Sequence, residues 1–370
     1  MKRIPKVTTI NEPIVKYLSG LNSLLIFLPV SLIIFLHFHQ PLWVFMTAAI
    51  AIVPLAGLMG EATEELAKHL GPQWGGLVNA TFGNATELII GLFALHQGLL
   101  DLVRASIVGS VIGNILLVLG ASVLAGGIKN GAQMFNRDHA RSQGLNLLLA
   151  VVSLAVPAIF AANLGTNMRL RAVPIRELSV GVSLLLLFVY TSSLAFSWSR
   201  REDHFRRGEG DHEVPTWSKR LAFTVLGAAT LGIAVESELL VRSVVDATSA
   251  LGINQLFVGI IVIPIIGNAA EHSTAVTMAI KNKMDIAMSI AVGSSTQVAM
   301  FVAPVLVLCS VSLGHTLSYI FSVPELTAVG FAVIIAAFLA NDGKSHWLYG
   351  AQLLTAYAII ALAFYFLPAP

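Results

Sequence analysis

The sequence predicts an all-α polytopic membrane protein, on the evidence of its composition, its apolar segments and an internal repeat. Hydrophobic residues make up 56% of the 370 residues and charged residues only 11%, whereas soluble domains carry about 25% charged residues. The mean hydropathy is +0.81. Because so few charges cannot cover a water-facing surface, we expect the chain to lie in a lipid bilayer. The net charge of +2 argues against a nucleic-acid partner.

About eleven apolar segments are long enough to cross a bilayer, since a helical span takes about 20 residues. We expect these helices near 21–38, 42–67, 75–97, 101–126, 145–162, 177–198, 220–242, 254–281, 285–312, 322–340 and 346–367. No small-residue cleavage site follows the first segment, so we interpret it as a helix and not as a signal peptide. A single cysteine, Cys309, excludes an internal disulfide and a Cys-rich metal site.

The basic residues predict the orientation of the chain, because cytoplasmic loops carry an excess of Lys and Arg. With the N-terminus inside, only five of the 22 Lys and Arg residues fall outside. These five are Arg104, Arg169, Arg171, Arg176 and Arg242. We therefore expect a cytoplasmic N-terminus, an odd number of spans and a C-terminus on the opposite side.

An internal repeat relates the two halves of the chain. The motif Gly-Asn-Ala-Thr-Glu at 83–87 recurs as Gly-Asn-Ala-Ala-Glu at 267–271, an offset of 184. At the same offset Asp101, Gly109 and Ser110 match Asp285, Gly293 and Ser294. Five helices per half is an odd number, so the two halves are expected to have opposite topology. Inverted repeats of this kind are typical of secondary transporters, whose substrate site lies at the midplane between the repeats.

The repeat divides the chain into four parts. We expect an N-terminal tail and first helix at 1–41, a first five-helix repeat at 42–198, a cytoplasmic linker at 199–219 and a second five-helix repeat at 220–370. The linker is the most polar stretch of the chain. We interpret it as a solvated tether, with a regulatory cation site on its acidic residues as the alternative.

Glu87 and Glu271 each lie near the middle of an apolar segment, where a charge costs at least about 2.5–3.5 kcal/mol. No Lys or Arg lies at a similar depth to form an intramembrane salt bridge, so we expect a functional role. Each Glu follows an Asn by three residues, and each motif begins with a Gly that favours a broken helix and free backbone carbonyls. Carboxylate, amide and carbonyl oxygens are the ligands that Ca²⁺ prefers. The expected cation ligands are therefore Glu87, Glu271, Asn84, Asn268, Gly83 and Gly267.

The same two carboxylates also suit protons. Together they balance the charge of one Ca²⁺, and without the cation they would repel each other in a poorly solvating environment. Both effects favour proton uptake, so a single site that takes either Ca²⁺ or protons needs no separate proton pathway. His272 follows Glu271 directly, and we expect it to be either a proton carrier or a packing residue.

Further polar residues flank this expected centre. Glu64 and Glu238 lie toward opposite ends of their helices, as inverted halves require, and are candidates for cation or proton access. For Glu64 the alternative is a surface pair with Lys68, four residues later. Asn114 and Gln297 lie in two other helices, where each either completes the ligand shell or bridges helices by hydrogen bonds.

The two motifs, at 83–90 and 267–272, resemble the signature repeats of the calcium/proton exchanger family, which belongs to the calcium/cation antiporter superfamily. The likeness covers roughly 60–312 in motifs and the whole chain in layout. It implies one extra helix followed by two inverted five-helix repeats, with Glu87 and Glu271 as the essential acidic pair in a central cavity. It also implies cation passage at Glu64 and Glu238. The nearly balanced linker departs from the acidic linker of many relatives, which argues against a calcium sensor there.

We therefore expect a secondary transporter, not an enzyme, that exchanges Ca²⁺ for H⁺ by alternating access and removes Ca²⁺ from the cytoplasm. Its expected partners are these two ions and the lipid bilayer, without a cofactor; a homo-oligomer is left open. The alternatives are Na⁺ as counter-ion, Mn²⁺ as cargo or, third, a cation channel. An intramembrane hydrolase lacks support, because neither His-Glu-x-x-His nor Gly-x-Ser-x-Gly occurs. The plasma (inner) membrane is the expected host, with a vacuolar or thylakoid membrane as the alternative.

Overall fold

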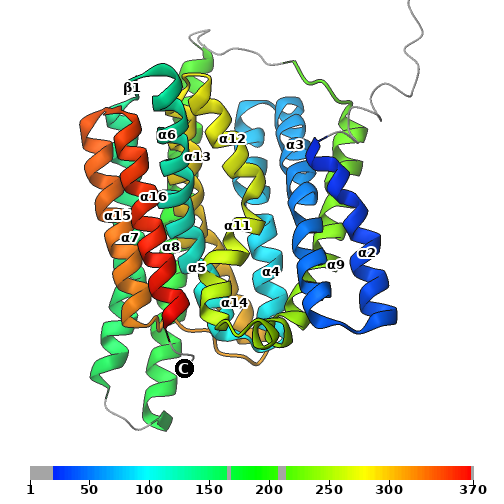
Figure 1. The fold of residues 1–370 in the computed structure, drawn as a ribbon. Helices are drawn as coiled ribbons and strands as arrows, with labels where there is room; N and C mark the ends of the chain where they lie inside the picture. The colour runs from blue at the N-terminus through cyan, green and yellow to red at the C-terminus, as the bar shows by residue number, and fades with distance from the viewer. Residues whose placement is uncertain (1–19, 165–167, 207–213, 368–370) are drawn as a thin grey trace, which may run out of the picture.

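The computed structural model describes residues 20–164, 168–206 and 214–367, and these residues are almost entirely helical. The expected N-terminal tail and the middle of the expected linker lie outside the described residues. Figure 1 shows the helices gathered into one bundle, in which α2 begins at the upper end and α16 finishes at the lower end. A two-stranded antiparallel pair, β1 with β2, closes the upper end near α6 and α16.

The first half of the described chain contains the following elements: η1 (Gly20–Ile26), α2 (Phe27–Ile33), η2 (Ile34–Phe38), α3 (Pro41–Phe82), α4 (Ala85–His96), α5 (Leu100–Ile112), η3 (Gly113–Val118), α6 (Leu119–Asn130), β1 (Gln133–Met134), α7 (Arg137–Asn163) and α8 (Met168–Arg206). The second half contains α9 (Lys219–Leu251), α10 (Gln255–Phe257), η4 (Val258–Val262), α11 (Ile263–Gly267), α12 (Ala269–Ile280), α13 (Met284–Gln297), η5 (Val298–Val302), α14 (Ala303–Ser312), α15 (Val323–Asp342), β2 (Lys344–Ser345) and α16 (Trp347–Phe366).

Nine helices in the described residues are long and apolar enough to cross a membrane. A tenth span is a bent pair, Gln255–Gly267 with Ala269–Ile280, whose two parts meet at 63°. The segment expected at 75–97 is divided between the end of α3 and α4, which is apolar but too short to cross alone. It is the first-repeat counterpart of the bent pair, so both copies of the repeated motif lie at a helix break.

The internal repeat is visible in the backbone. Asn84 and Asn268 both leave the helical conformation, with φ/ψ of −112°/24° and −101°/8°. The π-helical turns η3 and η5 also lie at matching places, because 113–118 shifted by the repeat offset gives 297–302. The packing is reciprocal, since α4 contacts α9 while α12 contacts α3. π-helical turns such as η3 and η5 occur often at functional sites.

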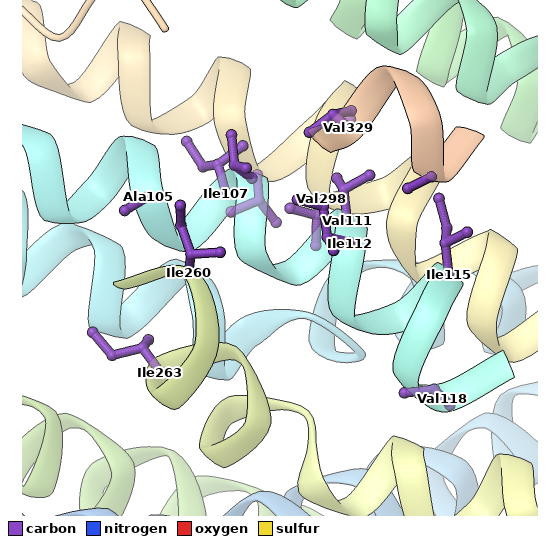
Figure 2. Close-up of a cluster of buried hydrophobic side chains, with 14 of the residues drawn as sticks. Ala105, Ile107, Val111, Ile112, Ile115, Val118, Ile260, Ile263, Val298 and Val329 are labelled. Atoms are coloured by element: carbon purple, nitrogen blue, oxygen red, sulfur yellow. The ribbon is translucent and has the colours of Figure 1, made fainter. Parts of the chain in front are cut away.

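The buried apolar side chains form two clusters. The larger one surrounds α5 and η3 and contains one half of α3, from Val44 to Ile52, and one half of α9, from Leu239 to Ala247. Figure 2 shows part of it, in which side chains of α5 and η3 lie among Ile260, Ile263, Val298 and Val329. The smaller cluster joins the other halves of α3 and α9, from Leu55 to Leu66 and from Ala222 to Ile233. Helices α3 and α9 therefore pack against each other in the smaller cluster, and the other part of each helix packs in the larger cluster.

The first helix packs against α3 and α9, and a buried polar contact joins it to α9. Ser31 is the one buried residue of α2, and its hydroxyl donates to Oε1 of Glu236 on α9 at 2.8 Å. Glu236 is 0% exposed, although it lies in the middle of a membrane-spanning helix. The extra helix thus supplies a hydroxyl donor to a carboxyl group buried within the bundle.

Candidate cation site

Glu87 and Glu271 lie in the first turns of α4 and α12. Each helix starts directly after a break, so its free backbone N–H groups point back toward the break. A helix N-terminus carries a partial positive charge that favours a nearby carboxylate. The local sequence therefore places each acidic side chain where the helix dipole offsets part of the cost of its charge.

The two motifs cross each other at the interface of the repeats. A Cβ atom added to Gly267 would lie 3.7 Å from Oε1 of Glu87, and one added to Gly83 would lie 3.6 Å from Oε1 of Glu271. Each glycine is thus the neighbour of the other motif's glutamate. The structure brings together two side chains that are 184 residues apart.

Three of the four carboxylate oxygens in this pair lack a partner. Both oxygens of Glu87 and Oε2 of Glu271 are buried and accept no hydrogen bond from the described residues. A buried carboxylate without a partner is costly. The pair therefore requires either a bound cation or protons, and two charges suit one divalent cation. Within the described part of the chain, no group of three or more His, Cys, Asp or Glu side chains could hold a metal.

A hydrogen-bonded network of amides and a hydroxyl surrounds the first motif. Asn84 donates through Nδ2 to Oε1 of Gln297 at 2.5 Å, and the Ser294 hydroxyl donates to Oδ1 of Asn84 at 3.0 Å. Asn114 donates in turn to the Ser294 hydroxyl at 3.1 Å. The network connects α13 with η3 and with the break before α4. Because an amide oxygen has two lone pairs, Asn84 retains one acceptor position.

The second motif has a different environment. Asn268 donates to the carbonyl of Pro264 in the preceding helix, α11, at 3.1 Å. Ser110, the repeat counterpart of Ser294, instead lines a small cavity that reaches Glu87. Ser106, Ile107, Ile263 and Leu306 also line this cavity. The two halves of the site are thus similar in sequence but differ in their contacts.

The expected access residues lie in surface pairs. Glu64 is exposed and lies 3.3 Å from the Lys68 ammonium, which is the pair that the sequence offered as an alternative. Glu238 lies 2.5 Å from the Arg242 guanidinium, and both side chains are partly exposed. In the described part of the chain, no hydrogen bond or ion pair joins either carboxylate to the central pair. His272 lies beside Glu271 in sequence, and its Nε2 atom is buried and has no hydrogen-bond partner among the described residues.

Two sets of polar contacts were not expected from the sequence. Ser294 bridges Asn84 and Asn114, and its match with Ser110 in the repeat was the available signal. Glu65, one residue after Glu64, accepts hydrogen bonds from residues that begin the second repeat. No local pattern distinguishes Glu65 from its acidic neighbours.

Comparison with known families gives a match over most of the chain. The family described as sodium/calcium exchanger protein matches residues 40–199 and 221–366. A Ca²⁺/H⁺ antiporter of Aphanothece halophytica is 43% identical, over 94% of this chain and 96% of its own length. The Ca²⁺/H⁺ antiporter ChaA of Bacillus subtilis (strain 168) is 44% identical, over 87% and 92%. A Ca²⁺/H⁺ antiporter of Synechocystis is 46% identical, over 88% and 91%.

Solved structures give the same result for the fold. The structure of native YfkE superposes with a TM-score of 0.81 at 40% identity, covering 94% of this chain and all of that one. The structure of the H⁺/Ca²⁺ exchanger CAX superposes with a TM-score of 0.70 at 15% identity, covering 93% of this chain and 91% of the other. At that identity the second likeness concerns the fold alone. The expectation of an all-α membrane fold is confirmed.

Proposed function

This chain belongs to the Ca²⁺/H⁺ antiporter family within the sodium/calcium exchanger superfamily, and we propose that it exchanges Ca²⁺ for H⁺ at the Glu87–Glu271 pair and so removes Ca²⁺ from the cytoplasm. It is a transporter and not an enzyme. The observation that carries the proposed site is the meeting of two carboxyl groups from opposite repeats, of which three buried oxygens accept no hydrogen bond from the residues that the structure describes.

Coupling follows from competition for the same oxygens. One Ca²⁺ neutralises both carboxylates, and its departure leaves two like charges that are buried and unsolvated. Protonation removes both penalties. The protein can therefore change the side from which the site is reached when the site holds Ca²⁺ or protons. The same conformational change is too costly when the site is empty and both carboxylates are charged. This asymmetry produces exchange without any additional proton channel.

The proposed ligands are oxygens that a flexible site can adjust. Glu87 and Glu271 supply carboxylates, and the chain around Gly83 and Gly267 supplies carbonyls at the helix breaks. Asn84 and Asn268 supply amide oxygens from these breaks. Ca²⁺ accepts six to eight oxygen ligands in variable geometry, so irregular backbone suits it. Gln297 and Asn114 act through Asn84, whose orientation the network holds.

The proposed topology places the N-terminus in the cytoplasm and the C-terminus outside. The bias of the basic residues supports it, and so does the arrangement of the described helices, which begin and finish at opposite ends of the bundle. The relatives from Bacillus subtilis and Synechocystis are bacterial, which supports the cell membrane as the host. Glu64 and Glu238 then lie toward the cytoplasmic and outer halves of their helices, where they act in cation access.

Transport into everted membrane vesicles tests the proposal. We expect an imposed pH gradient, acidic inside, to drive uptake of radioactive calcium, and a protonophore to abolish it. A Na⁺ gradient of the same size, without a pH gradient, should drive no uptake. Vesicles from cells without the protein provide the background. Uptake that follows the Na⁺ gradient and ignores the pH gradient would refute proton coupling.

A further inference from the structure

The segment that leads into the second repeat is bound to α3 by hydrogen bonds centred on Glu65. The backbone N–H groups of Thr216 and Trp217 donate to Oε2 of Glu65 at 2.7 and 2.9 Å. The Lys68 ammonium donates to Oε1 at 3.1 Å. Glu65 is only 4% exposed, so both carboxylate oxygens are occupied in a nearly dry environment. Hydrogen bonds to an ionised group are stronger than neutral ones.

A second bond, one turn further along α3, binds the same segment. Nε2 of His69 lies 2.7 Å from the carbonyl oxygen of Trp217. A carbonyl can only accept, so the proton lies on Nε2 of His69. The Trp217 ring is 9% exposed and belongs to the smaller apolar cluster with Leu66 and Leu226. Trp217 is therefore held through its N–H, its carbonyl and its ring.

These contacts connect the two repeats where α9 begins. Ser218 follows Trp217 directly and caps α9, because its hydroxyl accepts a hydrogen bond from the Leu221 N–H at 3.2 Å. On the other side, His69 lies two residues before Gly71, where α3 is interrupted at φ +80°. We call the contacts of Glu65 and His69 with 216–217 the latch. In the proposed topology it joins the cytoplasmic end of the Pro41–Gly71 part of α3 to the start of α9.

The position of the latch relates it to transport. Helices α3 and α9 are the corresponding helices of the two repeats, and they share the smaller apolar cluster. α3 contacts α12, which carries Glu271, while α9 contacts α4, which carries Glu87. A joint displacement of α3 and α9 would change the cover over both acidic side chains at once. Alternating access in inverted-repeat transporters is largely a rigid-body movement of this kind.

We propose that Glu65 and His69 are positioning residues for ion exchange, which lock 216–217 onto α3 so that α3 and α9 move as one body. The proposal rests on the proposed antiport, since the movement in question is the one that carries the ions. Neither residue touches the ions. Their removal should slow the change of access and leave the affinity for Ca²⁺ nearly unchanged.

The first test is a separation of rate from affinity in proteoliposomes with an imposed pH gradient. We expect Glu65→Ala to lower the maximal rate of Ca²⁺ uptake about tenfold, with a half-saturation concentration close to that of the wild type. Glu65→Gln should lose less, because its amide oxygen still accepts from the backbone N–H groups. Ser218→Ala is the matched control, since it removes the cap of α9 without removing the latch.

The second test uses a reversible cross-link and keeps the proposal falsifiable if Glu65→Ala fails to fold. Cys309 is the one cysteine of the chain, so Cys309→Ser provides a cysteine-free background. In this background, the two thiols of the double variant Glu65→Cys, Thr216→Cys are joined by a short thiol-specific cross-linker that reduction removes. We expect the cross-linked protein to transport several times faster than the same protein after reduction, because the link replaces the lost bonds.

Two outcomes would overturn the proposed role of the latch in transport. One is a wild-type maximal rate in folded Glu65→Ala, and the other is a cross-linked protein that is inactive until it is reduced. In both cases the unmodified protein in parallel liposomes must still show proton-driven uptake. If the unmodified protein itself fails to do so, the antiport proposal is wrong, and the two failures are thereby distinguished.

Discussion

Oε1 of Glu87 lies 3.7 Å from the position that a Cβ atom on Gly267 would occupy, so the glycine of one repeat borders the glutamate of the other. The reciprocal relation holds for Gly83 and Glu271, at 3.6 Å. The crossing leaves room around two buried carboxyl groups whose oxygens have few protein partners. Side chains at these two positions would fill that room.

The two glycines should respond differently to alanine. At Gly267 the nearest atoms to a new Cβ belong to Glu87, at ordinary contact distance, whereas at Gly83 the carbonyl oxygen of Asn79 would lie 2.7 Å away. We expect Gly267→Ala to fold normally and to raise the Ca²⁺ concentration for half-maximal uptake. Gly83→Ala should also lower the thermal stability, since the backbone must shift. Equal melting temperatures for the two variants would contradict this reading.

Neutralising either central carboxyl group should abolish exchange without unfolding the protein. In Glu87→Gln or Glu271→Gln, one Ca²⁺ would face a single carboxylate, and the remaining positive charge is severely unfavourable in a low dielectric. The amide keeps the size of the side chain, so folding should survive. Calcium uptake and size-exclusion profiles of both variants check this. Wild-type uptake by either well-folded variant would show that the site lies elsewhere.

Acidification of the calcium-loading side should weaken Ca²⁺ binding. The carboxylates must lose their protons before they can hold the metal, so a lower pH raises the apparent half-saturation concentration for Ca²⁺, and a higher pH lowers it. Mg²⁺ should compete poorly because it demands tight octahedral geometry and gives up water reluctantly. Uptake measured across a pH series, with and without Mg²⁺, tests both statements. A half-saturation concentration that does not change with pH would separate proton transport from the metal site.

The contact between Ser31 and Glu236 should stabilise the attachment of α2. Ser31→Ala removes the hydrogen bond that Oε1 of the buried Glu236 accepts, a loss of about 1–3 kcal/mol. Glu236→Gln should be milder, since its amide still accepts from the serine hydroxyl. Thermal unfolding in detergent measures both effects. Proton-driven uptake at low temperature should stay near that of the wild type, because neither residue contacts the central pair. A Ser31→Ala variant as stable as the wild type would show that apolar packing alone holds α2.

The sequence by itself determined the membrane class, the approximate position of the spans, the internal repeat and the acidic pair. These features are local or periodic: a run of apolar residues predicts a span wherever it occurs, and the repeat can be read at one constant offset. The sequence also favoured helix breaks at Gly83 and Gly267, and both breaks occur one residue later, at Asn84 and Asn268.

Only the tertiary structure decided which polar residues meet. The break at Asn84 is held by Gln297 and Ser294 from another helix, and Glu65 rather than Glu64 binds the start of the second repeat. Ser31 finds Glu236 across 205 positions. Lipid tails are as apolar as leucine, so helix association within a bilayer depends on close packing and interhelical hydrogen bonds and not on hydrophobic burial. Hydropathy therefore locates the helices, whereas their partners follow from contacts between residues far apart in the chain.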